Sequence, residues 1–272
     1  MEIQWPLVIF AWAAGCGGVV FSFVGLSELL GVAKKTRVPA TIVSLVLLVI
    51  GGCASVLHLG QPSNIMAAAT NILSFSGISV ELIMLGINFV LGLVYLILYR
   101  NESATAMKVV GAVAIVTGLL MAFVTGHGYV MDSQEYWNNA VAFGYLGSGM
   151  GMGATLFTSL MTVTKAEEAD FKKIWPFTLG CTIAQGVLFL IYGISIGFVG
   201  NPALYWGGAI VVGSVGSILF SVFVRKQPKL AWAAFVCAAI GGICFRCVMF
   251  LLGYGFLELF DLAAAHSVLG LD

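Results

Sequence analysis

The sequence predicts an all-α integral membrane protein with eight transmembrane helices, and three observations lead to this fold class. Of the 272 residues, 60% are hydrophobic and only 9% are charged, so the chain cannot cover itself with a water-soluble surface. Eight stretches reach the roughly 20 apolar residues that a helix needs to cross the hydrocarbon core. Among the loops between these stretches, only alternate ones carry basic residues, as expected for a chain that crosses the membrane at each stretch.

The predicted spans cover most of the chain and are separated by short polar or Gly/Pro-containing loops. We therefore treat residues 1–272 as one transmembrane domain. The first span follows Glu2 and no Lys or Arg, unlike a cleavable signal peptide, so we expect it to be retained. The spans are residues 5–31, 38–60, 77–99, 106–128, 139–163, 175–197, 204–224 and 230–256.

The distribution of positive charge predicts the orientation. Eleven of the twelve basic residues lie in or beside the first, third, fifth and seventh loops. Short loops rich in Lys and Arg stay in the cytoplasm. The odd-numbered loops are therefore predicted to face the cytoplasm, and the N and C termini the outer side. The twelfth basic residue, Arg246, falls within the last span. Because the formal net charge is zero, nothing indicates a nucleic-acid partner.

Small residues within the spans predict close helix packing. The 34 glycines include Gly147 and Gly151, and Gly149 and Gly153, at the GxxxG spacing that lets a neighbouring backbone approach. A phosphate-binding loop would need a preceding strand, which the sequence does not predict. The six cysteines all fall inside apolar runs, where Cys acts as a small hydrophobe, so we expect neither disulfides nor a metal site.

Four ionisable residues lie at or near the predicted outer boundary. His58 is close to the end of the second span, Glu81 lies about one turn into the third, and His127 ends the fourth. Arg246 lies in the outer half of the last span. Ionisable groups near lipid are costly and therefore mark functional sites. The four residues together predict a site at this boundary.

Each of these residues also has an ordinary structural interpretation. A histidine at a helix end is often simply solvated, and Glu81 would favour the positive N-terminal end of its helix. Arg246 would then extend toward the outer surface or pair with Glu81 or Glu258. A single haem held by His58 and His127 is a weaker alternative. Its axial ligands usually come from facing helices, whereas these two histidines both lie at the same outer boundary.

The loop between the second and third spans predicts an interfacial helix. Residues 61–76 carry no charge, and their apolar residues repeat at helical spacing. We expect this amphipathic segment to cover a pocket between the two spans. Its apolar residues are Ile65, Met66, Ala69, Ile72 and Leu73.

Two motifs resemble a known family. The opening Glu2-Ile3-Gln4-Trp5-Pro6-Leu7-Val8-Ile9-Phe10 and the segment His58-Leu59-Gly60-Gln61-Pro62 resemble the membrane anchor subunits of the DMSO reductase family. The eight-span plan is also similar, so the resemblance extends over essentially the whole chain. It implies an anchor in the bacterial cytoplasmic membrane that binds menaquinol and carries no haem or metal. It also implies electron transfer to an iron–sulfur subunit, which in turn supplies a molybdopterin catalytic subunit.

The resemblance implies roles for particular residues. His58 and Glu81 correspond to the histidine and the acidic residue of the family's quinol site. The sequence departs from the family pattern at Asn64 and Val80, where the family usually has arginine. Arg246 is the candidate to replace that positive charge. The predicted quinol pocket therefore contains His58, Asn64, Glu81, His127 and Arg246.

The chemistry of hydroquinone oxidation is compatible with these residue types. The reaction releases two protons with two electrons, so the hydroxyls need partners that accept protons near neutral pH. His58 is such a group, and a partly desolvated Glu81 is another. The partner subunits are predicted to dock on the outer face, near residues 61–76 and 129–138. Two alternatives stay open at this point, a small-solute transporter and a polysulfide-reductase-type anchor.

Overall fold

The computed structural model describes residues 3–58 and 76–269, with side chains described up to Gly253 except that of His58. The regular secondary structure in this part of the chain is all helical, and this part contains no strand. Eight helical segments are long and apolar enough to span a membrane, which confirms the predicted fold class. The elements are α1 (Trp5–Leu30), α2 (Lys34–His58), α4 (Gly77–Arg100), α5 (Ala104–His127), α6 (Asn139–Val163), α7 (Glu168–Ser195), η2 (Ala203–Gly216), α8 (Ser217–Val224) and α9 (Leu230–Leu269).

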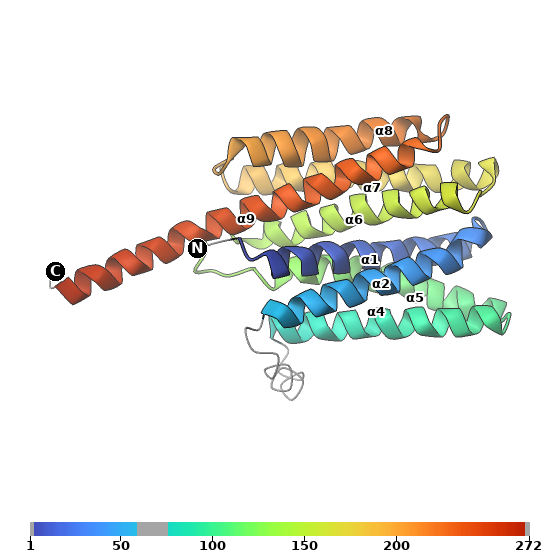
Figure 1. Cartoon of the computed structure of the whole chain (residues 1–272), viewed down its shortest axis with the longest axis horizontal. Helices are drawn as coiled ribbons and strands as arrows, with labels where there is room; N and C mark the ends of the chain where they lie inside the picture. Colours follow the sequence, from blue (N-terminus) through green and yellow to red (C-terminus); the bar gives the residue numbers. More distant parts are fainter. Residues whose placement is uncertain (1–2, 59–75, 270–272) are drawn as a thin grey trace.

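The helices run beyond several of the predicted spans. Helix α2 begins at Lys34 instead of residue 38, and α7 begins at Glu168 instead of residue 175. Helix α9 continues to Leu269, past the predicted end at residue 256, and projects from the bundle in Figure 1. An apolar run measures the width of the hydrocarbon core, whereas backbone hydrogen bonds and capping set the ends of a helix. The polar first turn of α7 carries Glu168 and Asp170, which stabilise a helix N-terminus.

The bundle has two groups of helices joined through α1 and α6. Helices α1, α2, α4 and α5 lie together, and α6, α7, η2–α8 and α9 form the other group (Figure 1). The most apolar stretch of α1 is 83% buried inside the bundle, and that of α6 is 78% buried, whereas that of α4 is only 17% buried. Helices α1 and α6 therefore form the centre, and α4 leaves most of its surface to lipid.

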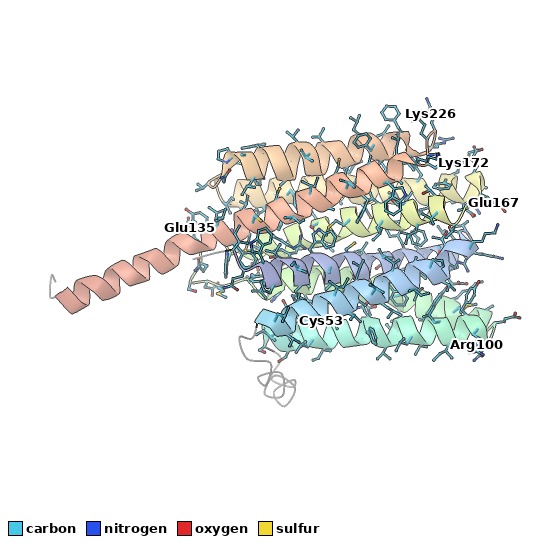
Figure 2. All side chains as sticks on the ribbon, viewed as in Figure 1. Cys53, Arg100, Glu135, Glu167, Lys172 and Lys226 are labelled. Carbon is cyan, nitrogen blue, oxygen red and sulfur yellow. The ribbon has the colours of Figure 1, made fainter. Side chains whose placement is uncertain are left out.

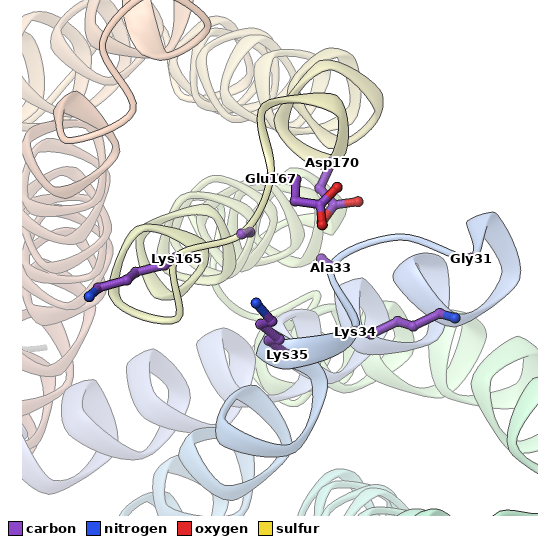
Figure 3. A pocket seen from close by; sticks show the side chains of 8 residues that line it. Gly31, Ala33, Lys34, Lys35, Lys165, Glu167 and Asp170 are labelled. Carbon is purple, nitrogen blue, oxygen red and sulfur yellow. The ribbon is translucent and has the colours of Figure 1, made fainter.

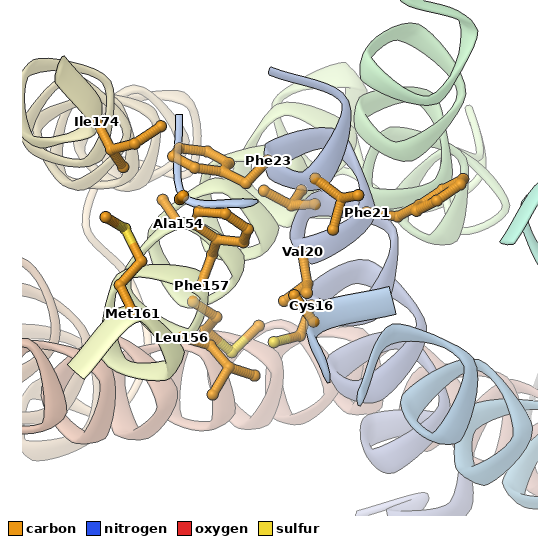
Figure 4. Packing of buried hydrophobic residues seen from close by; sticks show 14 of the residues in the cluster. Cys16, Val20, Phe21, Phe23, Ala154, Leu156, Phe157, Met161 and Ile174 are labelled. Atoms are coloured by element: carbon orange, nitrogen blue, oxygen red, sulfur yellow. The ribbon is translucent and has the colours of Figure 1, made fainter. Parts of the chain in front are cut away.

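The central contact between α1 and α6 is apolar. Phe23 of α1 packs against Phe157 of α6 with ring centroids 5.7 Å apart. Figure 4 shows these rings near Val20 of α1, with Leu156 and Met161 of α6 in the same apolar cluster. This packing fixes the two groups of helices against each other.

Glycines bring the helices into close contact, as the GxxxG spacing predicts. A Cβ added at Gly147 or Gly151 would meet side chains of α7, whereas one added at Gly149 or Gly153 would meet α1 or α5. The two pairs therefore serve two different faces of α6. A Cβ at Gly25 of α1 would overlap the carbonyl group of α5 at residue 111, so these two helices also approach closely.

The seventh crossing combines two helix types. Its first part, η2, is a π-helix, and its second part, α8, is an α-helix. A Cβ added at Gly213 of η2 would lie 2.3 Å from Cα of Gly241 on α9. Glycines on both sides thus allow the wider π-helix to pack directly on α9.

The two ends of the bundle differ in the charged side chains that they carry. Figure 2 shows Arg100, Lys172 and Lys226 at one end, which we call the basic end. Glu135 lies at the other end, where α2 finishes and α4 begins. We call this the hollow end, after the hollow described in the next subsection. The gathering of basic side chains at one end agrees with the alternation of the basic loops in the sequence.

A buried ion pair joins three helices near the basic end. Arg37 of α2 donates to the carboxylate of Glu28 on α1, and both side chains are nearly inaccessible to solvent. The hydroxyl of Tyr95 on α4 donates to the same carboxylate at 2.8 Å. A buried charge pair holds its position only when further hydrogen bonds satisfy it. The Glu28 carboxylate therefore serves to hold α1, α2 and α4 together.

Candidate functional site

A hollow of about 330 Å³ lies at the hollow end of the bundle. Both groups of helices contribute to it, through the start of α1, the end of α2, the first turn of α4, the loop between α5 and α6, and α9. Its lining residues are Gln4, Leu7, Ser55, Ile78, Glu81, Gly128, Tyr129, Met131, Trp137 and Phe250. Most of these are apolar or aromatic, with a few polar groups, as is usual for sites that bind small organic molecules.

Glu81 is the acidic group of this hollow. It lies just after the first turn of α4, whose N-cap Ser76 accepts a hydrogen bond from the backbone N–H of Ser79. Only 9% of Glu81 is exposed. The ion pairs of the described side chains, Arg37–Glu28 and Lys172–Glu168, do not include it. Its side chain is one of the residues that line the hollow.

Gly128 gives the carboxyl of Glu81 its space. A Cβ added at Gly128 would lie 2.8 Å from Oε1 of Glu81, closer than carbon and oxygen atoms normally approach. The loop that follows α5 therefore passes directly beside the carboxylate. A side chain at position 128 would displace it.

Three aromatic rings form one wall. The ring centroids of Tyr129 and Trp137 are 5.7 Å apart, and that of Phe250 lies 5.4 Å from Tyr129. The indole N–H of Trp137 donates to the carbonyl oxygen of Met249 at 2.9 Å, which ties the loop to α9. Edge-to-face rings of this kind make a rigid apolar surface.

Tyr129 also brings a polar group to the hollow. The residue lies in the loop after α5 and is 9% exposed. Burial raises the pKa of its phenol well above the usual value. A phenol is protonated at neutral pH even at its usual pKa, so the Tyr129 hydroxyl is able to donate a hydrogen bond.

The other predicted site residues lie at different distances from this hollow. His58 is the last residue of α2, three positions after Ser55, which lines the hollow. Asn64 and residues 61–75 of the predicted interfacial segment lie outside the described residues. His127 is exposed, and its ring lies 5.9 Å from that of Phe123. It does not line the hollow, although the next residue, Gly128, does.

Arg246 lies deeper in the bundle. It is fully buried, and its guanidinium donates to Oγ of Ser148 at 2.8 Å and to the carbonyl oxygens of Gly242 at 2.8 Å and Ala11 at 3.1 Å. These contacts join α9 to α6 and α1. The sequence predicted Arg246 as a quinol-pocket residue, with an outward extension or an ion pair with Glu81 or Glu258 as the structural alternative. Arg246 does not line the hollow, and among the described side chains it has no ion pair.

One aromatic ring separates Arg246 from the wall of the hollow. The guanidinium lies over the ring of Tyr145, 4.5 Å from its centroid. The Tyr145 ring in turn lies 5.6 Å from Tyr129. Nε of Arg246 and the Tyr145 hydroxyl have no hydrogen-bond partner in the described part of the chain. The positive charge is thus held behind the hollow and does not line it.

Sequence reasoning did not identify several lining residues. The sequence assigned no role in the site to Gln4, Ser55, Tyr129, Trp137 or Phe250. They converge only because helices distant in sequence pack together. The described residues include no group of three or more His, Cys, Asp or Glu side chains suited to a metal ion.

The fold and the hollow define a multi-pass helical membrane protein with a small, mostly apolar cavity at one end of its bundle. The family model for the DMSO reductase anchor subunit (DmsC) matches residues 1–203, more than half of the chain. The chain therefore belongs to the family of DMSO reductase anchor subunits. A search of curated proteins finds no match.

Membership of this family carries two consequences. An anchor subunit associates with the catalytic and iron–sulfur subunits of a DMSO reductase complex. The matched residues include Glu81, Gly128, Tyr129 and Trp137, so most of the hollow belongs to the part that defines the family. Helix α9, with Arg246 and Phe250, lies beyond the match.

Proposed function

We propose that this anchor subunit oxidises menaquinol in the hollow beside Glu81 and passes the electrons to the iron–sulfur subunit of its complex. The observation that carries the proposal is a buried carboxyl without an ion-pair partner among the described side chains, set in a cavity with an aromatic wall. A hydroquinone ring needs an apolar slot with a few polar groups directed at its hydroxyls.

The proposed chemistry assigns separate tasks to the residues. Glu81 and His58 accept the two protons released as the quinol loses two electrons. Tyr129, which stays protonated, donates a hydrogen bond to a quinone oxygen. Trp137 and Phe250 hold the ring, and the isoprenoid tail lies in lipid. Asn64, outside the described residues, is kept as a proposed quinol contact, and we assign His127 no direct contact with the quinol.

The proposal also includes orientation and partners. We place the hollow end and both termini on the outer side of the bacterial cytoplasmic membrane, because the basic residues gather at the opposite end. Protons are then released outward. The iron–sulfur subunit docks at the hollow end near residues 129–138, where Asp132 and Glu135 supply charge. The family match favours this function over the transporter and polysulfide-reductase alternatives.

Quinol turnover by the assembled complex tests the proposed site. His58→Ala and Glu81→Gln are each expected to lower turnover about 100-fold, because each removes a proton acceptor. Glu102→Gln, at an exposed position in the loop after α4, is the control and should keep normal turnover. If the complex assembles and both site variants oxidise quinol at the normal rate, the assignment is wrong.

A further inference from the structure

We propose that the basic end carries a binding site for the headgroup of an anionic phospholipid. The site is a second pocket of about 910 Å³, between the loop that joins α6 to α7 and the loop that joins α8 to α9. We call it the cation-lined pocket. Its lining residues are Ala166, Glu168, Phe171, Lys172, Arg225, Lys226 and Pro228.

The charge of this pocket favours a phosphate group. Three of its residues are cations and one is an acid. Glu168 is already bound to Lys172 at 2.9 Å, one turn along α7. Arg225 and Lys226 form no ion pair with any described carboxylate. The pocket therefore has an uncompensated positive charge of about two, from exposed side chains at its rim.

The position of the pocket favours a lipid over a free anion. Its floor includes the buried ring of Phe171, with Pro228 and Ala166 beside it. Arg225 lies 6.0 Å from the ring of Trp175, whose indole N–H donates to the carbonyl oxygen of Ser221 at 2.8 Å. Tryptophan and arginine at the end of a span are typical of the level of lipid headgroups. An apolar floor under a cationic rim suits a phosphate attached to a glycerol and its acyl chains.

A neighbouring pocket provides an internal comparison. Lys34, Lys35 and Lys165 line the same pocket as Glu167 and Asp170, and Figure 3 shows Lys35 directed toward the two acids. This mixed-charge pocket has about 300 Å³ and two acids that are free to offset its lysines. It lies at the same end of the bundle and should attract an anion far less.

Lipid binding to the purified full chain tests the proposal. The delipidated chain in neutral detergent is titrated with dioleoylphosphatidylglycerol or dioleoylphosphatidylcholine, and bound lipid is counted by native mass spectrometry. Dioleoylphosphatidylglycerol should bind more tightly than dioleoylphosphatidylcholine. Arg225→Gln with Lys226→Gln should weaken its binding about tenfold or more, since each cation near a headgroup contributes about one kcal/mol.

The matched control is Lys34→Gln with Lys35→Gln, which removes the same charge from the mixed-charge pocket. It should change binding by less than about twofold. Equal losses in both double variants, or no preference for phosphatidylglycerol, would overturn the proposal. Displacement of the lipid by inorganic phosphate at equal concentration would assign the pocket to a free anion instead.

A single substitution tests the proposal in a chain whose folding is checked separately. Lys226→Gln alone changes one exposed side chain and should weaken binding several-fold in a chain that keeps its helical circular dichroism. Unchanged lipid binding by this variant would also count against the proposal. Quinol turnover does not enter this experiment, so the lipid site and the quinol site fail or stand separately.

Discussion

Gly128 has no side chain at the point where the carboxyl of Glu81 occupies the neighbouring space. Gly128→Ala would place a methyl group 2.8 Å from Oε1 of Glu81 and displace the carboxyl. Because small displacements of a reacting group cost large factors in rate, quinol turnover should fall about tenfold or more. Turnover of the assembled complex with a soluble menaquinol analogue measures the effect.

The control for this change is Gly86→Ala, which adds the same methyl group in α4 where nothing lies within 4 Å. It should leave turnover unchanged and stabilise α4 slightly, because alanine favours helix more than glycine. Normal turnover in Gly128→Ala would show that the position of the Glu81 carboxyl does not limit the reaction.

Arg246 is a cation held by neutral groups. Its guanidinium reaches a hydroxyl on α6 and carbonyl oxygens on α1 and α9, which the single ammonium of lysine cannot do together. Arg246→Lys should therefore lower the free energy of unfolding by about 2 kcal/mol. Thermal unfolding in detergent measures this loss.

Arg100→Lys, at the exposed end of α4, is the matched control and should leave the unfolding temperature unchanged. An equally small effect at Arg246 would mean that its contacts contribute little to stability. The sequence places Arg246 within the last span, but two of its three partners, Ser148 and Ala11, come from helices more than 90 residues away. No local pattern predicts them.

At the scale of the helices, α1 is the element that most of the bundle packs against. Gly25→Ala would push its methyl group into the backbone of α5 at Gly111. A rigid backbone cannot move aside as a side chain would, so the unfolding free energy should fall by about 2 kcal/mol. Thermal unfolding of the purified chain checks this value.

Gly180→Ala is the comparison, since nothing lies within 4 Å of a Cβ at that position of α7. It should be neutral or slightly stabilising. A similar loss in both variants would indicate helix propensity or handling effects instead of close packing between α1 and α5.

The elements also show what the sequence can and cannot predict. Apolar length identified all eight spans, and GxxxG spacing identified the packing faces of α6. The π-helix η2 was not predicted, because its apolar sequence has no local feature that separates it from an α-helix. The hollow was predicted in part. Its acidic residue Glu81 follows from the cost of charge near lipid, whereas Tyr129, Trp137 and Phe250 meet only through tertiary packing.

At the scale of the whole molecule, the orientation can be measured directly. Glu135→Cys lies at the hollow end and Glu102→Cys at the basic end, both at exposed loop positions. In spheroplasts with an intact cytoplasmic membrane, a membrane-impermeant maleimide should label the Glu135→Cys variant to a much greater extent than the unmodified chain. It should label Glu102→Cys only after the membrane is opened. The reverse pattern would place the hollow on the cytoplasmic side.

In the proposed function, electrons from menaquinol enter the complex through the hollow beside Glu81. The most direct measurement is the rate at which a menaquinol analogue reduces the iron–sulfur centres of the purified complex, followed by electron paramagnetic resonance. The complex with the unmodified anchor should show rapid reduction. The Glu81→Gln complex should be slower by about 100-fold, although dithionite reduces its centres fully. Equal rates in the two complexes would contradict the claim.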